Sequence, residues 1–538
     1  MSDITLVNLN MLFMRYGQEI ERELHVPLGC LYVTTALEAA GFDVDFRDYQ
    51  LCPSDSPFDM DVLLEFMRDP APVIGLSCMA NLLPFTILAM RELKRRYPGH
   101  TLVLGGVGAK CVEEPILRRF PWIDVICRGE GEATAVELLA ALKSGRDLAD
   151  VRGISFRQRG AGVSPSSNVP LDQTPEDVKP ASPRRGQDAR ETRGRDALAT
   201  RGRDARVTLD AHATVHTPDR PRIADLDGIG FPAWRKIDLA RYAGYGMMTS
   251  RGCPYHCTFC SVAPVWNHQS HSRSPQNIVA EMVYLHRHAG VELFLFQDEF
   301  FVSGKRQVMD FCRELRDSGI GVKWKAFGRV NLIDREMMHA MADTGCLELR
   351  FGIESGSDRI LQLVRKGFTA AQALEIVPQA VEIFPRVDTF YVWGFPFETM
   401  EDFNQSLFQM ISFRAMGARI LPSLLSLLPQ TDVYRQHIAD AGGTAKLEFC
   451  PYLLPEFVFT GHEISRGGEI DIPPRYREYF DLIATNPDIF PGFFHIDFQN
   501  NVLPKLELLR QFGFYPEAPG SDDAETRRRG DTERDIGG

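Results

Sequence analysis

Three cysteines close together in one short loop constrain this chain more than any other feature. Cys253, Cys257 and Cys260 follow the spacing C-x3-C-x2-C. Thiolates grouped in this way hold zinc or iron–sulfur clusters. Gly252 and Pro254 flank the first cysteine, and both residue types are disfavoured inside a helix. The three thiols are therefore predicted to lie in a metal-binding loop rather than on one face of a helix.

The spacing favours an iron–sulfur cluster. With no fourth cysteine near, three ligands would leave one iron of a [4Fe–4S] cube open to a small molecule. Zinc is the alternative, with His256 inside the loop as a fourth ligand. The paired spacing of common zinc motifs is absent, however.

Length and composition narrow the class of protein. A chain of 538 residues is expected to form two or three domains, and 44% hydrophobic with 25% charged residues is typical of a soluble globular protein. No apolar run approaches the roughly 20 residues of a membrane helix, and the N-terminus lacks a signal sequence. We therefore expect no membrane partner. The 11 cysteines favour a reducing cytoplasm, and a net charge of −12 gives no electrostatic reason to expect a nucleic-acid partner.

Residues 1–150 alternate short apolar strands with helices, which predicts a parallel α/β sheet. Ligands of such sheets bind beyond the carboxyl ends of the strands. Ser77, Gly105, Gly106 and Gly129 stand at those ends, where glycine lets a bulky ligand approach the backbone. Tight turns are the alternative explanation, and the better one for the Gly105–Gly106 pair taken alone. The predicted strands are 4–9, 44–47, 73–77, 101–104 and 124–127, and the predicted helices are 27–40, 83–96 and 133–142.

Residues 157–224 have a different composition. Near-repeats at 185–189, 193–197 and 201–205 recur at an eight-residue interval, with few apolar residues. Such a segment cannot offset the entropy of ordering, so we predict a disordered linker or insertion. Residues 516–538 form a polar, charged tail, which we also predict to be disordered.

Residues 240–445 repeat a strand–loop–helix unit, which predicts a parallel barrel or part of one. The chemistry of such barrels lies at the carboxyl-terminal rim. The predicted strands are 291–296, 322–327, 347–351, 389–393 and 419–427, and the predicted helices are 275–290, 305–317 and 334–343. The candidate rim residues are Asp298, Glu299, Arg329, Glu354, Ser355 and Gly394. For each of them alone, a salt bridge or turn explains the residue equally well.

Residues 446–515 are rich in aromatic residues, including Phe457 and Phe459. A small, mostly helical cap over the barrel mouth, where it would select the substrate, is one interpretation. Simple packing of a helical extension is the other.

The motif C-x3-C-x2-C, with Phe259 before the last cysteine, resembles the signature of radical S-adenosylmethionine (SAM) enzymes. Residues 1–150 look like the cobalamin-binding domain that precedes the radical SAM domain in one large subclass. The resemblance implies a Rossmann-like domain followed by a partial (β/α)6 TIM-type barrel. The Asp-x-His-x-x-Gly motif of other cobalamin proteins is absent here. This absence is common in the subclass, and it also leaves open a domain that has lost cobalamin.

The resemblance also implies roles for particular residues. Cys253, Cys257 and Cys260 would ligate a [4Fe–4S] cluster whose open iron binds SAM. The implied SAM contacts are Phe259, Asp298, Glu299, Arg329, Glu354, Ser355 and Gly394. The implied cobalamin contacts are Ser77, Gly105, Gly106 and Gly129.

The activity implied is that of a cobalamin-dependent C-methyltransferase. A 5′-deoxyadenosyl radical would abstract hydrogen from a small-molecule, peptide or lipid substrate, and methylcobalamin would donate the methyl group. An external flavodoxin or ferredoxin would supply electrons. A member of the subclass that cyclises or rearranges its substrate without methylation is the alternative, and a metal-stabilised binding protein is a weaker one. A methylthiotransferase acting on RNA is disfavoured, because residues 1–150 contain no second cysteine triad.

Overall fold

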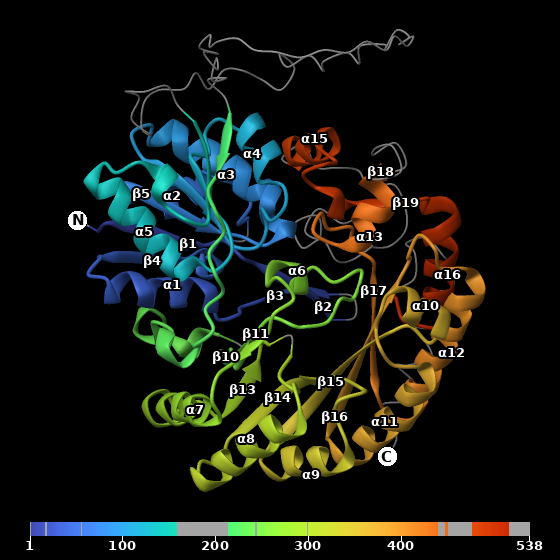
Figure 1. Cartoon of the computed structure of the whole chain (residues 1–538). Coiled ribbons are helices and arrows are strands. Elements are labelled where there is room, and N and C mark those ends of the chain that lie inside the picture. The colour runs from blue at the N-terminus through green and yellow to red at the C-terminus, as the bar shows by residue number, and fades with distance from the viewer. Residues whose placement is uncertain are drawn as a thin grey trace, which may run out of the picture.

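The computed structural model of the chain describes residues 2–16, 19–54, 56–158, 213–242, 245–298, 300–439, 447–449 and 476–515 (Figure 1). Five features singled out from the sequence lie outside the described residues. They are Glu299, Phe457, Phe459, the repeats at 185–205 and the tail at 516–538.

The N-terminal domain is a seven-stranded sheet in the order β4-β1-β5-β6-β7-β8-β9. Its first five strands are parallel, as predicted. They are β4 (Val44–Asp48), β1 (Ile4–Asn8), β5 (Val73–Ser77), β6 (Thr101–Gly105) and β7 (Val125–Cys127). Every residue of β1 is buried, because helices cover both faces of the sheet. The helices are α1 (Leu28–Ala39), α2 (Met60–Phe66), α3 (Leu83–Arg96), α4 (Glu113–Arg119) and α5 (Gly131–Ser144).

The sheet extends further than the sequence predicts. The strands β8 (Ile154–Arg157) and β9 (Thr214–His216) add an antiparallel edge, although residues 157–224 were assigned to a disordered linker. Arg157 anchors this edge by donating hydrogen bonds to the carbonyl groups of Leu117, Phe120, Pro121 and Ile123. The prediction was therefore wrong for residues 157–158 and 213–224. A hairpin of β2 (Leu12–Tyr16) and β3 (Glu19–Glu23) was also missed.

The central domain is a six-stranded parallel sheet in the order β10-β13-β14-β15-β16-β17. Its strands are β10 (Tyr245–Met247), β13 (Leu293–Phe296), β14 (Lys323–Gly328), β15 (Cys346–Glu354), β16 (Arg386–Trp393) and β17 (Arg419–Leu424). The strands of this sheet pair in the order in which they occur along the chain, and no pairing is found between the described end strands β10 and β17, so the sheet is open rather than a closed barrel. This confirms the predicted partial (β/α)6 architecture.

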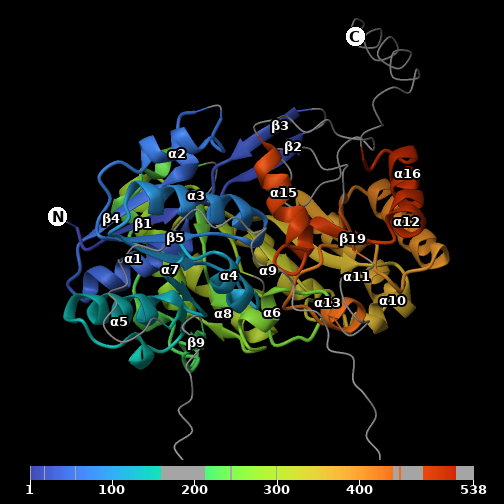
Figure 2. The same ribbon diagram turned by 90° about the horizontal axis from the view of Figure 1, so that it is seen from above.

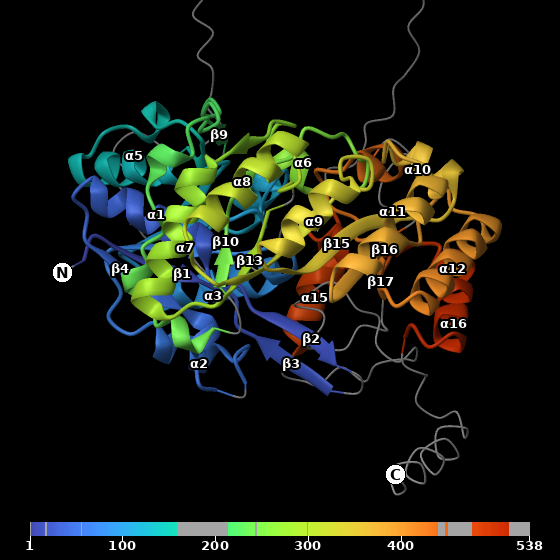
Figure 3. The ribbon, with the colours of Figure 1, turned by 90° about the horizontal axis from the view of Figure 1, so that it is seen from below.

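Helices cover the outer face of this sheet, where α7, α8 and α9 lie side by side (Figure 3). The helices are α7 (Pro275–Ala289), α8 (Lys305–Asp317), α9 (Arg335–Asp343), α10 (Asp358–Leu363), α11 (Ala370–Ile383) and α12 (Met400–Ala415). α7 begins where predicted: Ser274 caps the helix by accepting a hydrogen bond from the Asn277 backbone N–H, and Pro275 follows at its first position. Short elements are α6 (Val262–Val265), β11 (Ser250–Arg251), β12 (His271–Ser272) and α13 (Asp432–Tyr434).

The C-terminal region contacts both domains (Figure 2). α15 (Arg477–Thr485) packs on α3, where the Tyr479 hydroxyl donates to the Phe58 carbonyl at 2.6 Å. α16 (Leu503–Gln511) packs on α12, and β18 (Leu447–Phe449) pairs with β19 (Phe494–Ile496). None of the described helices is long and apolar enough to cross a membrane.

His495 on β19 makes this region sensitive to acid. Burial lowers the pKa of His495 from 6.5 to about 4. The folded form therefore favours the neutral ring. The stability gained is present above pH 6.5 and is lost as the pH falls towards 4. We expect the free energy of unfolding to drop by about 1 kcal/mol more between pH 7 and pH 5.5 in the wild type than in His495→Phe, as urea denaturation would show. Equal pH dependence in the two proteins would contradict this.

Candidate functional site

The loop that carries the three cysteines follows β11 and is held at several backbone positions. Gly252 has φ +87°, and a Cβ atom there would overlap the carbonyl oxygen of Gln269, so only glycine fits. The Thr258 backbone N–H donates to the Val364 carbonyl at 3.1 Å, and the Thr258 carbonyl accepts from the Val433 N–H at 2.9 Å. The cluster loop, residues 252–260, is thus fixed from both sides.

The three thiols of this loop lie close enough for each to affect the titration of its neighbours. Burial raises the pKa of Cys253 and of Cys260, and the nearby Cys257 raises each of them further. Among the described residues, no group of three or more His, Cys, Asp or Glu side chains is arranged around a single metal position. The His256 ring instead stacks on His268, with 4.0 Å between ring centroids.

A cavity of about 230 Å³ adjoins the first cysteine at the carboxyl-terminal rim of the barrel. Cys253, Arg329, Glu354 and Lys366 all line it. Glu354 and Lys366 form an ion pair at 2.7 Å, and each side chain is only 10% exposed. Glu354 also has φ +70°, a strained conformation for a residue other than glycine and one that is frequent at functional sites. The cavity therefore presents a carboxylate and an ammonium group together.

Lys366 is a residue that sequence reasoning missed. It follows α10, outside every strand end, so the barrel pattern gives no signal for it. Its carbonyl group accepts a hydrogen bond from Arg329, whose guanidinium lies 3.6 Å from the centroid of the Tyr255 ring. Lys366 also lowers the pKa of the Cys260 thiol, against the larger effect of burial. The segments that carry Tyr255, Arg329 and Lys366 are far apart in the sequence and meet through these contacts.

Two sequence candidates lie beside this cavity rather than in its lining. The buried Asp298 carboxylate accepts from the Thr249 backbone N–H at 2.7 Å and from the Ser250 hydroxyl at 3.3 Å, so it supports the strand before the cluster loop. The Phe259 ring packs against Phe395, with 5.8 Å between centroids.

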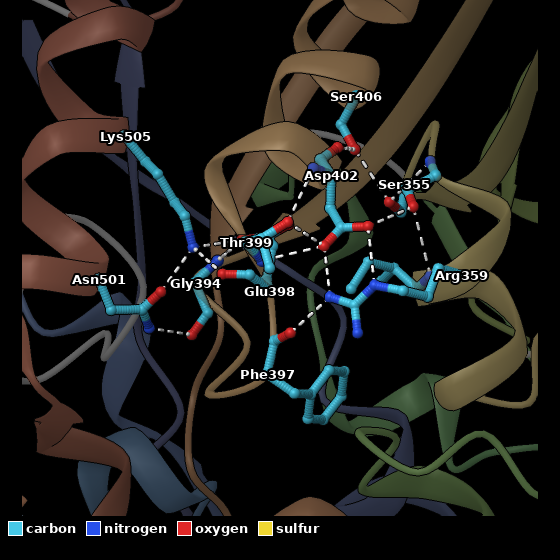
Figure 4. A network of polar contacts seen from close by, with 12 residues as sticks. Ser355, Arg359, Gly394, Phe397, Glu398, Thr399, Asp402, Ser406, Asn501 and Lys505 are labelled. Atoms are coloured by element: carbon cyan, nitrogen blue, oxygen red, sulfur yellow. Dashed lines mark hydrogen bonds and ion pairs between the residues drawn. The ribbon is translucent and has the colours of Figure 1, made fainter.

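Ser355 and Gly394 belong to a network of polar contacts behind the rim (Figure 4). The Gly394 N–H donates to Glu398 Oε2 at 2.8 Å, and its carbonyl accepts from Asn501 Nδ2 at 3.1 Å. Lys505 on α16 pairs with the buried Glu398 at 2.8 Å. The hydroxyl groups of Ser355 and Ser406 lie 2.9 Å apart. The C-terminal region thus holds the turn after β16 in place.

A larger cavity, of about 340 Å³, lies between the two domains. All four N-terminal candidates line it, and so do five residues from the barrel side. The former are Ser77, Gly105, Gly106 and Gly129, and the latter are Met248, Ser250, Arg251, Trp266 and Gln297. A Cβ atom at Gly29 or Gly129, both in the lining, would meet no atom within 4 Å. The open, largely glycine- and apolar-lined wall fits a bulky ligand such as a corrin ring.

Two family models match this chain, one in each of its two main domains. The model of the B12 binding domain matches residues 21–139, and that of the Radical SAM superfamily matches residues 247–410. Among curated proteins, an uncharacterized methyltransferase, PH0819, from Pyrococcus horikoshii is 27% identical, over 71% of this chain and 72% of its own. An anaerobic magnesium-protoporphyrin IX monomethyl ester cyclase from Synechocystis is 28% identical, over 74% of this chain and 70% of its own.

A solved structure has the same fold. The radical SAM methyltransferase TsrM from Kitasatospora setae, with cobalamin and a [4Fe–4S] cluster bound, superposes with a TM-score of 0.59 over 83% of this chain and 80% of its own, at 18% identity. One conclusion follows from the two matched domains, from the shared fold and from the two cavities. The chain belongs to the radical SAM enzymes that carry a B12-binding domain, whose cofactors are a [4Fe–4S] cluster, SAM and cobalamin.

Proposed function

We propose that the protein is a cobalamin-dependent radical SAM C-methyltransferase acting on a small molecule. The observation that carries this is the cavity between the domains, because Arg251 in its wall stands two residues before Cys253. A methyl donor in that cavity would lie next to the cluster loop. When bound, the cluster and SAM supply a carbon radical that removes hydrogen from the substrate, and cobalamin supplies the methyl group.

The residues of the chain bind and orient these groups. Cys253, Cys257 and Cys260 are the proposed cluster ligands. In the rim cavity, Lys366 would donate hydrogen bonds to the carboxylate of SAM, and Glu354 would accept them from its amino or hydroxyl groups, which their shared position in the lining supports. Arg329 holds the Lys366 carbonyl and so orients the loop.

The remaining assignments concern domains and partners. Residues 1–150 would bind cobalamin, residues 240–445 would carry the radical chemistry, and residues 446–515 would enclose the substrate. A flavodoxin- or ferredoxin-type protein would deliver electrons, and the reducing cytoplasm suits thiolate ligands. The contacts of Lys505 and Asn501 with the Gly394 turn support a role for the C-terminal region at the rim.

Methyl transfer to cobalamin can be tested without knowing the substrate. We expect the protein, loaded with cluster and reduced cobalamin, to transfer a deuterated methyl group from SAM to cobalamin, with one S-adenosylhomocysteine formed per methyl group. The measurement is mass spectrometry, with a protein-free reaction as control.

The alternative is cyclisation without methylation, which the similarity to the magnesium-protoporphyrin cyclase keeps open. In that case SAM would be cleaved to 5′-deoxyadenosine, but no S-adenosylhomocysteine would form above the protein-free control. This outcome would rule out the methyltransferase.

A further inference from the structure

Four buried charged side chains join the wall of the large cavity to the cluster loop. Glu130 and Glu132 stand at the start of α5, and both accept hydrogen bonds from Arg251, at 3.0 and 2.5 Å. Arg222 pairs with the other oxygen of Glu130 at 3.0 Å. All four side chains are less than 10% exposed. We call these residues the charge quartet: Glu130, Glu132, Arg222 and Arg251.

The quartet contacts the segment that follows the cluster loop. Arg222 donates to the carbonyl groups of Trp266 and Gln269, at 2.9 and 3.2 Å, and its guanidinium lies 4.5 Å from the centre of the Trp266 ring. Those two residues pack against Gly252, the first residue of the cluster loop. Arg222 therefore fixes the segment that follows the cluster loop, and the side chain of Arg251 fixes the backbone position that directly precedes it.

The charges within the quartet balance, two carboxylates against two guanidinium groups. Burial alone would lower the pKa of Arg251, but Glu132 and Glu130 outweigh burial and raise it. A buried charge that loses its partner is strongly unfavourable, so the four side chains are expected to move together or not at all. Three of them, Glu130, Glu132 and Arg251, also line the large cavity, as does Trp266.

We propose that the charge quartet couples the two cofactor sites, so that cobalamin binds more tightly when the cluster loop is held in its cluster-bound form. A loose cluster loop would release Arg251 and Trp266 from the cavity wall and leave that wall incomplete. Because binding free energies are reciprocal, cobalamin must stabilise cluster binding by the same factor. The inference rests on the proposed cofactor sites and is independent of methyl transfer.

The test compares the cobalamin affinity of the full chain with and without its cluster. Equilibrium dialysis with hydroxocobalamin, with cobalt measured under anaerobic conditions, gives both dissociation constants. We expect cluster-loaded wild-type protein to bind at least about fivefold more tightly than cluster-free protein. In Arg251→Lys, which keeps the charge but loses the fork that reaches both carboxylates, the ratio should fall to about one. Glu132→Gln is a second variant, which changes a single carboxylate to an amide. Its ratio of dissociation constants should also fall to about one.

The matched control is Asp124→Asn, which breaks a buried ion pair with Lys94 in the same domain but away from the cavity lining. It should lower stability while keeping the wild-type ratio. A ratio of one in the wild type, or an unchanged ratio in both quartet variants, would overturn the coupling and leave the cofactor assignment standing. Failure of wild-type protein to bind cobalamin in either form would overturn the coupling and the proposed function together.

Discussion

Cys257→Ala is expected to abolish both cluster binding and SAM cleavage. The thiol lies at the centre of the cluster loop, where it contacts the Arg365 carbonyl at 3.7 Å, and the variant would leave two cysteine ligands for the cluster. After anaerobic reconstitution we expect iron to fall from about four per chain to the background. Formation of 5′-deoxyadenosine under reducing conditions should fall below detection, because the remaining loop cannot hold the iron that binds SAM.

Cys312→Ala is the matched control. Cys312 is a buried cysteine of α8, outside the cluster loop, and burial raises the pKa of its thiol to about 11. Its replacement by alanine removes a thiol of the same kind from the same domain. We expect full iron content and SAM cleavage in this variant. Retention of about four irons by Cys257→Ala would show that Cys257 is not a ligand.

Lys366→Met is expected to weaken SAM binding and to destabilise the barrel rim. The lost hydrogen bonds from the ammonium group to a carboxylate are worth about 1.5–3 kcal/mol, or roughly 10- to 150-fold in the dissociation constant. Glu354 would also remain buried without its ion-pair partner, at a cost of about 3–5 kcal/mol in the free energy of unfolding. Isothermal titration of cluster-loaded protein with SAM and urea denaturation measure the two effects separately.

The double variant Glu354→Gln/Lys366→Met separates binding from folding. It removes both charges together, so most of the lost stability should return. If both residues contact SAM, its affinity should stay at least as weak as in the single variant. Recovery of SAM affinity together with stability would mean that the pair acts only on the structure of the rim.

Part of the fold is predictable because strands such as β5 and β6 are apolar and buried on both faces. Continuous apolar runs such as Val73–Ser77 and helices with clear caps such as Pro275–Ala289 appear in the structure with the predicted bounds or nearly so. The edge strand at 214–216 was missed because it is three residues long and follows a long polar segment. Its place depends on pairing with β8, which no local pattern reveals.

The residues of the candidate site were likewise predictable only where a local sequence pattern marks them. The cysteine spacing and the glycines at strand ends are local patterns, and the structure places the four N-terminal candidates in one cavity. Lys366 and Arg222 became visible only with the tertiary fold, because each acts through contacts with segments distant in the chain. Asp298 shows the reverse case: it stands at a strand end, but its carboxylate turns to the backbone of Thr249.

The most direct test of the account is metal analysis of the full chain purified without oxygen in the presence of hydroxocobalamin. Iron, sulfide and cobalt are measured together, followed by SAM cleavage under reduction. The account predicts about four irons and one cobalt per chain, with 5′-deoxyadenosine formed. Iron without cobalt would contradict the cobalamin cavity and methyl transfer while leaving the radical chemistry. Absence of iron after reconstitution would contradict both.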